Sequence, residues 1–109
     1  RFLHRPIPAP ERRAFLQDFL LADYEAALGT IFTSVSKAAA ELMPQEFTKI
    51  NVPTLLVSGE YDKIIPAEMG RQAARLNQAI EYVIIPRTAH FPMLEDAPTY
   101  LQRVREFCQ

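Results

Sequence analysis

The sequence predicts an α/β fold whose second half is a strand–helix–strand–helix unit of a parallel sheet. Residues 52–59 and 81–85 are short, almost continuously apolar runs, as in parallel strands that are buried on both faces. Residues 66–76, between the two runs, carry apolar side chains at helical spacing, and residues 97–107 repeat that spacing after the second run. Strands that alternate with helices in this way form a parallel sheet with right-handed crossovers.

The first half of the chain predicts helices without strands. Prolines at positions 6, 8 and 10 indicate an extended arm, after which apolar residues from Glu11 onward recur at helical spacing. Asp23 is placed to cap a second helix that reaches about residue 32, and the alanine-rich residues 36–43 could add a third before a polar connector at residues 45–51. We therefore divide the chain into a helical segment with a linker, residues 1–49, and a sheet segment, residues 50–109.

Composition excludes several classes of function. The chain has 109 residues, of which 49% are apolar and 23% are charged, which is typical of one soluble globular domain. Its net charge of −1 gives no basic surface for nucleic acid or anionic lipid. No apolar run approaches the roughly 18 to 20 residues of a membrane-spanning helix. Cys108 is the only cysteine and there are two histidines, so we expect a cytoplasmic protein with no metal site and no cofactor.

Two strands are too few for a stable parallel sheet. Such a sheet has an unpaired edge on both sides, and its helices cover too little apolar surface. The sequence also begins at Arg1 without an initiator Met, so we expect it to be a piece of a longer protein. The missing strands would come from an N-terminal part of the same protein or from a companion chain.

Polar residues follow both expected strands. Residues 59–66 come directly after the first strand and contain Asp62, and residues 86–92 come after the second and contain His90. Ligands and catalytic groups gather at the carboxyl ends of parallel strands, which lie about 4.8 Å apart, so the two side chains could meet. A carboxylate beside an imidazole fixes its tautomer and stabilises the imidazolium that forms when it takes a proton from a nucleophile.

Both loops resemble those of a known family. The stretch 52–66, V-P-T-L-L-V-S-G-E-Y-D-K-I-I-P, is similar to the acid-bearing strand and loop of α/β-hydrolases, in which P-T-L-x-x-x-G-x-x-D-x-x-x-P recurs. The stretch 85–98 resembles the histidine loop and the start of the last helix of that family. The order of acid before histidine, at positions 62 and 90, also fits. The resemblance is clear over about residues 50–109 and implies that Asp62 and His90 are catalytic. Residues 1–49 resemble the helical lid of these enzymes only loosely, and we expect them to be a lid-like helical segment with a linker.

The sequence departs from the family pattern in two places. Ala89 stands where these proteins usually have glycine before the histidine. No G-x-S-x-G elbow is present, because Ser34, Ser36 and Ser58 all lack its glycines. The nucleophile is therefore expected outside this chain, and the chain alone is expected to be inactive. A serine there would cleave an ester, amide or thioester, an aspartate would serve dehalogenation or epoxide opening, and a vestigial triad would leave a binding or receptor module.

Several residues also have structural interpretations. His90 could be a loop histidine held by backbone groups, and Asp62 could cap the turn or helix that follows it. Glu60 could replace Asp62 as the acid. Glu95 and Asp96 are expected to cap the last helix.

Apolar residues are expected to line the site for a small-molecule substrate. The candidates are Phe91 and Met93 beside the histidine and Phe32 in the lid-like segment. Phe15, Phe19 and Tyr24 could join them, although aromatic residues at helical spacing more often belong to a core.

Overall fold

The computed structural model describes residues 3–23, 25–28, 30 and 44–109. Its elements in chain order are α1 (Ala9–Leu21), β1 (Thr54–Gly59), α4 (Ala67–Leu76), β2 (Ile80–Ile85), α5 (Pro92–Glu95) and α6 (Ala97–Cys108). Residues 25–28 and 44–48 are also helical, so the segment expected to be a polar connector contains a helical turn. Within these ranges, every helix is too short or too polar to cross a lipid bilayer.

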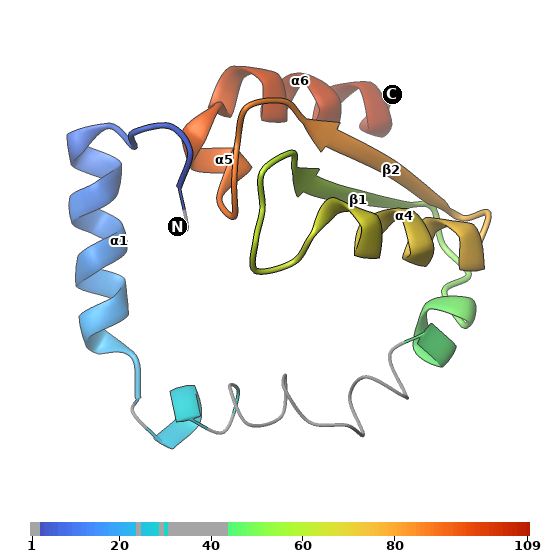
Figure 1. The fold of residues 1–109 in the computed structure, drawn as a ribbon, viewed down its shortest axis with the longest axis horizontal. Coiled ribbons are helices and arrows are strands. Elements are labelled where there is room, and N and C mark those ends of the chain that lie inside the picture. Colours follow the sequence, from blue (N-terminus) through green and yellow to red (C-terminus); the bar gives the residue numbers. More distant parts are fainter. Residues whose placement is uncertain (1–2, 24, 29, 31–43) are drawn as a thin grey trace.

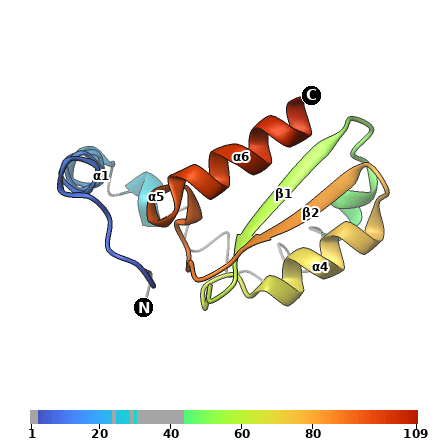
Figure 2. The ribbon, with the colours of Figure 1, turned by 90° about the horizontal axis from the view of Figure 1, so that it is seen from above.

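The second half forms the predicted parallel sheet. β1 and β2 pair in parallel, with Thr54 opposite Ile80 and Gly59 opposite Ile85. α4 covers one face of this sheet and α6 lies on the other (Figures 1 and 2). The prediction of an α/β fold with alternating strands and helices is therefore confirmed.

The apolar residues at both ends of β2 are buried, whereas the apolar residues of β1 are not. Ile80 and Ile85 of β2 are 7% and 0% exposed, and they belong to a small core with Ala73 of α4. Residues 54–57 of β1 are only half-buried. Parallel strands are normally covered on both faces and paired on both edges. In the described part of the chain β1 has one neighbouring strand, which leaves its other edge open.

α4 is fixed at both ends by polar contacts. At its start, the hydroxyl of Tyr82 donates to the carbonyl oxygen of Ala67 over 2.8 Å. At its end, the side-chain amide of Asn77 donates to the carbonyl oxygens of Phe47 and Ile50, at 2.9 and 2.7 Å. Asn77 therefore follows the last residue of the helix as its C-cap and also holds the segment that leads into β1.

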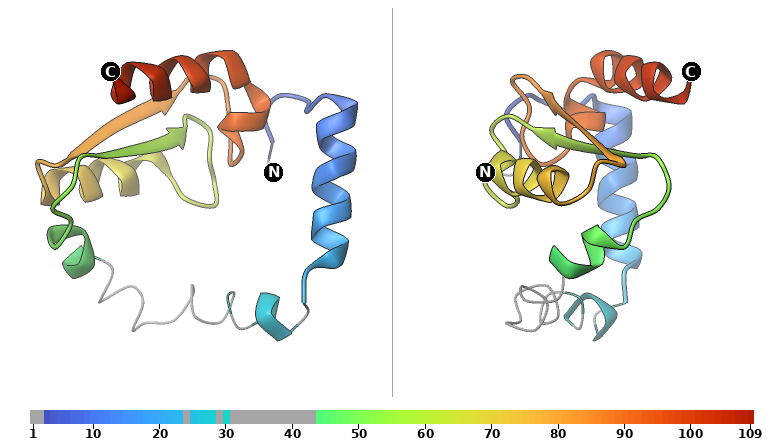
Figure 3. Two further views of the ribbon diagram at one scale, coloured as in Figure 1. Left: turned by 180° about the vertical axis from the view of Figure 1, so that it is seen from behind. Right: turned by 90° about the vertical axis from the view of Figure 1, so that its right-hand side faces the viewer.

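α1 lies apart from the sheet, beyond the carboxyl ends of both strands (Figures 1 and 3). It begins at Ala9, slightly earlier than predicted. Leu20 and Leu21 are more than 80% exposed, whereas the ring of Phe15 contacts that of Phe91 edge-on, with centroids 5.2 Å apart. The alanine-rich residues 36–43 lie outside the described residues, and the division into a lid-like segment and a core stays a prediction.

Candidate active site

The two loops expected to carry the chemistry meet at one edge of the sheet. β1 ends at Gly59 and β2 ends at Ile85, which are paired across the ladder. The amide of Tyr61 donates to the carbonyl oxygen of Thr88 over 2.8 Å, and the amide of Glu60 donates to that of Ile85 over 3.1 Å. Backbone pairing thus continues past the strands and fixes the loops relative to each other.

Gly59 is the point of closest approach between these loops. A Cβ at this position would lie 1.9 Å from the carbonyl oxygen of Ala89 and 2.8 Å from that of Thr88. No side chain fits into so short a separation without moving the backbone. The glycine that ends β1 is therefore required by the contact with the histidine loop.

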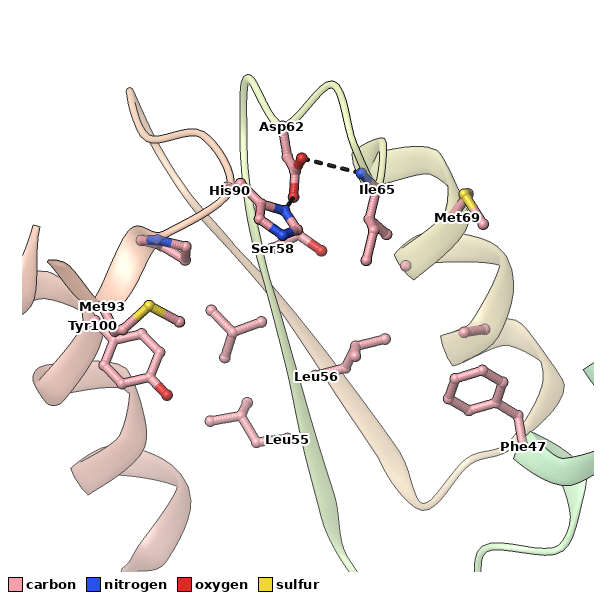
Figure 4. Close-up of a pocket in the computed structure, with 15 residues that line it drawn as sticks. Phe47, Leu55, Leu56, Ser58, Asp62, Ile65, Met69, His90, Met93 and Tyr100 are labelled. Carbon is pink, nitrogen blue, oxygen red and sulfur yellow. Dashed lines mark hydrogen bonds and ion pairs between the residues drawn. The ribbon is translucent and has the colours of Figure 1, made fainter. Parts of the chain in front are cut away.

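Asp62 and His90 form a hydrogen-bonded pair. Oδ2 of Asp62 lies 2.9 Å from Nδ1 of His90, and Oδ1 accepts a hydrogen bond from the amide of Ile65 over 3.0 Å (Figure 4). The amide of Ile64 donates to the same oxygen over 2.8 Å. The Asp62 side chain is 8% exposed and the His90 side chain 25%. The carboxylate therefore makes both of the contacts considered from the sequence, because one oxygen holds the turn and the other contacts the imidazole.

The electrostatics of the pair define the state of the imidazole. Burial alone raises the pKa of Asp62, but hydrogen bonds from His90, Ile65 and Ile64 outweigh it, so the pKa lies below its ordinary value of 3.8. Asp62 is ionised at neutral pH and can only accept hydrogen bonds. Nδ1 of a neutral His90 must then carry the proton, which leaves the lone pair on Nε2. This is the tautomer that a general base requires.

Glu60 and Asp96 have structural contacts instead. Oε2 of Glu60 accepts a hydrogen bond from the amide of Arg87 over 2.8 Å. Asp96 is the N-cap of α6 and accepts from the amide of Thr99 over 3.3 Å, as predicted, while its other oxygen pairs with Arg5 at 2.9 Å.

Glu95 differs from the prediction. It was expected to cap the last helix, but its side chain is turned into the protein, and the residue is 7% exposed. One oxygen accepts from the amides of His4 and Arg5, and the other from the amides of Ala89 and Phe91. The helix-cap prediction was therefore wrong for Glu95.

The histidine loop accommodates the unusual Ala89 without strain at that residue. Ala89 is 2% exposed and does not have a positive φ, so its methyl group creates no backbone conflict. Arg87 takes the left-handed conformation instead, with φ of 55°. Such a conformation costs a non-glycine residue about 1–2 kcal/mol. The hydrogen bond from the Arg87 amide to Glu60 holds it in place.

A cleft of about 450 Å³ begins at the Asp–His pair. Met93 and Tyr100 line one side and Ile65 and Met69 the other (Figure 4). Residues 55–59 of β1 also line it. Because consecutive strand residues point to opposite faces, a lining of five in a row means that the cleft runs along the open edge of β1.

The three residues expected to line the site, Phe91, Met93 and Phe32, do not share one position. Met93 lies in the wall of the cleft. The ring of Phe91 contacts the rings of His90 and Phe15 edge-on, with centroids 5.0 and 5.2 Å apart. Phe32 lies outside the described residues, as does Tyr24. In the part of the chain that the structure describes, no three His, Cys, Asp or Glu side chains are grouped so that they could hold a metal ion.

The comparison with protein families decides the assignment. A model of the alpha/beta hydrolase fold matches residues 26–97. The chain belongs to the α/β-hydrolase fold family. In this α/β-hydrolase chain, Asp62 and His90 lie in the matched region, at the ends of neighbouring strands.

Individual relatives are esterases and serine hydrolases. The chain is 28% identical over its full 109 residues to a pimeloyl-[acyl-carrier protein] methyl ester esterase of Neisseria meningitidis serogroup A, and it spans 34% of that protein's length. A serine hydrolase involved in carbazole degradation matches 60% of the chain with a TM-score of 0.57 and 31% identity, over 25% of its own length. An esterase from Thermogutta terrifontis, solved with malate bound, matches 64% with a TM-score of 0.54 and 30% identity, over 24% of its length.

Sequence reasoning missed the role of Glu95. Its position after Met93 and Leu94 and before Pro98 fits the start of a helix, which is where acidic residues are common. The amides that it binds come from two segments more than 80 residues apart in the chain. No periodicity or motif spacing reports such convergence.

Proposed function

We propose that the protein of which this chain is a part is a carboxylic ester hydrolase with a Ser-His-Asp triad, and that its serine lies outside this sequence. The observation that carries the proposal is the 2.9 Å contact between Nδ1 of His90 and Oδ2 of Asp62 at the mouth of a cleft. A carboxylate that is held by two backbone amides and directed at one imidazole nitrogen has the geometry of an orienting acid.

In the proposed reaction, His90 transfers protons through Nε2. The serine hydroxyl attacks the ester carbonyl as Nε2 takes its proton, and the resulting imidazolium is stabilised by Asp62. The C–O bond to the leaving alkoxide then breaks, and Nε2 returns the proton to it, so an alcohol departs and an acyl-enzyme remains. Water then attacks the acyl carbon as Nε2 takes its proton. The bond from this carbon to the serine oxygen breaks and Nε2 returns the proton to that oxygen, so the acid departs and the serine is restored.

An apolar acyl group suits the end of the cleft nearest His90. Ile65 and Met93 lie on its two sides, and both present apolar side chains toward it (Figure 4). The relative from Neisseria acts on the methyl ester of a pimeloyl chain carried by an acyl-carrier protein. We therefore propose esters of aliphatic carboxylic acids with small alcohols as the substrate class.

The rest of the sheet is proposed to come from another part of the same protein. β1 has an open edge in the described part of the chain, and Leu55, Leu56 and Val57 remain only half-buried. The part of the cleft along this edge lies where a further strand would pair with β1. The end of the cleft at His90 would then stay open to substrate.

The test is hydrolysis of p-nitrophenyl butyrate by the full-length polypeptide and by its His90→Ala variant. Loss of the general base is expected to lower kcat by roughly 10⁴-fold or more. His4→Ala is the matched control, since His4 is the other histidine of the chain and is itself exposed. Equal rates for wild type and His90→Ala would remove His90 from the mechanism.

A second experiment tests whether the nucleophile lies outside this sequence. The 109-residue chain alone is expected to show no hydrolysis above the buffer rate. Labelling of the full-length polypeptide with a fluorophosphonate, which reacts with activated serines, should modify one serine outside this sequence. A label on Ser58, or activity of the chain alone, would contradict the proposal.

A further inference from the structure

A buried carboxylate lies behind the histidine loop and has no part in the proposed reaction. Glu95 is 7% exposed, and its two oxygens divide their hydrogen bonds between two segments. Oε1 accepts from the amides of His4 and Arg5, at 2.5 and 2.8 Å. Oε2 accepts from the amides of Ala89 and Phe91, at 2.9 and 3.4 Å.

The side chain is ionised at neutral pH in spite of its burial. Burial raises the pKa of Glu95, but the amides of Arg5, Ala89, His4 and Phe91 outweigh it, so the pKa lies below its ordinary value of 4.5. A carboxylate only accepts hydrogen bonds, and every partner here is a backbone donor. The arrangement is therefore matched in hydrogen-bonding direction, since each contact joins an acceptor oxygen to an N–H donor.

Oε2 binds the two residues that flank His90. The amides of Ala89 and Phe91 precede and follow the histidine, so one oxygen fixes the backbone on both sides of it. Glu95 belongs to α5, which begins at Pro92 directly after this loop. These hydrogen bonds join the histidine loop to the helix that follows it. They fix the backbone on both sides of His90, and the direction of its side chain toward Asp62 depends on that backbone.

Oε1 attaches the N-terminal arm to the same unit. The arm at residues 3–8 precedes α1, and Ile7 within it is 8% exposed. The ring of His4 also contacts that of Tyr61, a neighbour of Asp62, with centroids 4.6 Å apart. Through these contacts the arm joins the acid loop, the histidine loop and α5.

We propose that Glu95 is a positioning residue for His90, which holds the histidine loop through the amides of Ala89 and Phe91 and anchors the arm to it. The proposal rests on the proposed function for its effect on hydrolysis, but the geometry of the imidazole can be measured without any substrate. Glu95 acts through backbone amides and touches no reacting atom.

The test uses Glu95→Ala and Glu95→Gln in the full-length polypeptide. Alanine removes every acceptor, whereas glutamine keeps the volume but offers an oxygen to only one of the two pairs of amides. We expect kcat for p-nitrophenyl butyrate to fall about 10- to 100-fold with little change in KM, since displacement of a catalytic group by about 1 Å has an effect of that size. If only the glutamine variant folds, its result decides.

A second readout reports on His90 directly. Ring ¹⁵N chemical shifts give the fraction of imidazole that is protonated at Nδ1, and that fraction should be high in the wild type and lower in both Glu95 variants. Asp96→Asn is the matched control. Asp96 is the adjacent carboxylate and also holds the arm, through Arg5, but its hydrogen bonds do not reach the histidine loop. Its variant should lose stability while it keeps the wild-type ring shifts and kcat.

The outcomes separate this inference from the proposed function. Folded Glu95 variants with unchanged ring shifts and unchanged kcat would overturn the positioning role and leave the esterase proposal standing. Altered ring shifts in the Glu95 variants, together with a wild-type protein that hydrolyses no ester, would refute the esterase proposal and keep the positioning role. Equal losses of kcat in Asp96→Asn and in the Glu95 variants would show a general loss of stability, which also contradicts the inference.

Discussion

The side chains of Asp62 and His90 meet at 2.9 Å although 28 residues separate them in the chain. The same carboxylate shapes its own loop, because its second oxygen accepts from the amides of Ile64 and Ile65. One side chain therefore determines both the turn after β1 and the tautomer of the histidine. A substitution that preserves the turn and removes the charge can separate the two effects.

Asp62→Asn is that substitution. Its amide oxygen can still accept from Ile64 and Ile65, so the fold should persist, but its amide nitrogen is a donor and favours the wrong tautomer of His90. We expect kcat for ester hydrolysis by the full-length polypeptide to fall roughly 10⁴-fold with KM nearly unchanged. Steady-state kinetics with a melting curve on the same sample measures both. A variant that loses activity only because it unfolds would contradict the assigned role.

Glu60→Gln is the matched control at the other carboxylate of this loop. Glu60 binds the amide of Arg87, so its oxygen can be replaced by that of glutamine without any effect on His90. The variant should keep most of the wild-type kcat. A loss as large as that of Asp62→Asn would indicate that Glu60 shares the role of the acid.

Gly59→Ala should destabilise the contact between the two loops. The added methyl group would meet the carbonyl oxygen of Ala89 at 1.9 Å, and backbone must move to admit it. We expect a loss of about 1–3 kcal/mol in the free energy of unfolding, the usual effect of overpacking. Urea denaturation followed by circular dichroism measures it.

Gly70→Ala provides the comparison for that variant. Its methyl group would meet the far end of the Tyr82 ring at 2.4 Å, which can turn aside when the hydrogen bond to Ala67 is lost. Alanine also favours the helix by about 1 kcal/mol. The loss should therefore be smaller than for Gly59→Ala, and the reverse order would argue against a rigid contact between the loops.

Stability is predicted to fall in acid through Asp62 and Glu95. Both carboxyls have a pKa below their ordinary values of 3.8 and 4.5 in the folded state. The unfolded chain therefore takes up their protons first, so the stabilisation is fully present above those values and is lost as the pH falls through the lower, folded-state pKa values. Thermal melts between pH 2 and pH 6 should show this loss, and Glu95→Gln should show a shallower dependence on pH. Equal slopes would mean that Glu95 does not contribute.

Phe15→Ala should loosen α1 and leave the sheet intact. The edge-on contact between Phe15 and Phe91 connects this helix to the histidine loop, and such pairs contribute about 0.5–1.5 kcal/mol. Hydrogen exchange of the amides of residues 9–21 should become faster, while that of residues 80–85 stays unchanged. Leu16→Ala, at a neighbouring position that is 53% exposed, should have less effect.

Most of what could be predicted of the fold followed from the pattern of apolar residues. Leu55 to Val57 and Val83 to Ile85 are continuous apolar runs, and burial of such runs in a sheet leaves few other arrangements. Parallel pairing then brings the loops after them together, which is why the contact of Asp62 with His90 could be anticipated. The helical turn at residues 44–48 could not, because it is largely polar and depends on distant hydrogen bonds from Asn77. The amides around Glu95 were equally hidden, since each is a property of backbone conformation and has no side-chain signature.

The open edge of β1 also determines where the loop of a further strand would lie. A strand that joins this edge in parallel must run in the same direction as β1, so its carboxyl end faces the same edge of the sheet as Gly59. The loop that follows such a strand is thereby brought to the end of the sheet that carries Asp62 and His90. Backbone hydrogen bonding, which is indifferent to sequence, is enough to bring it there.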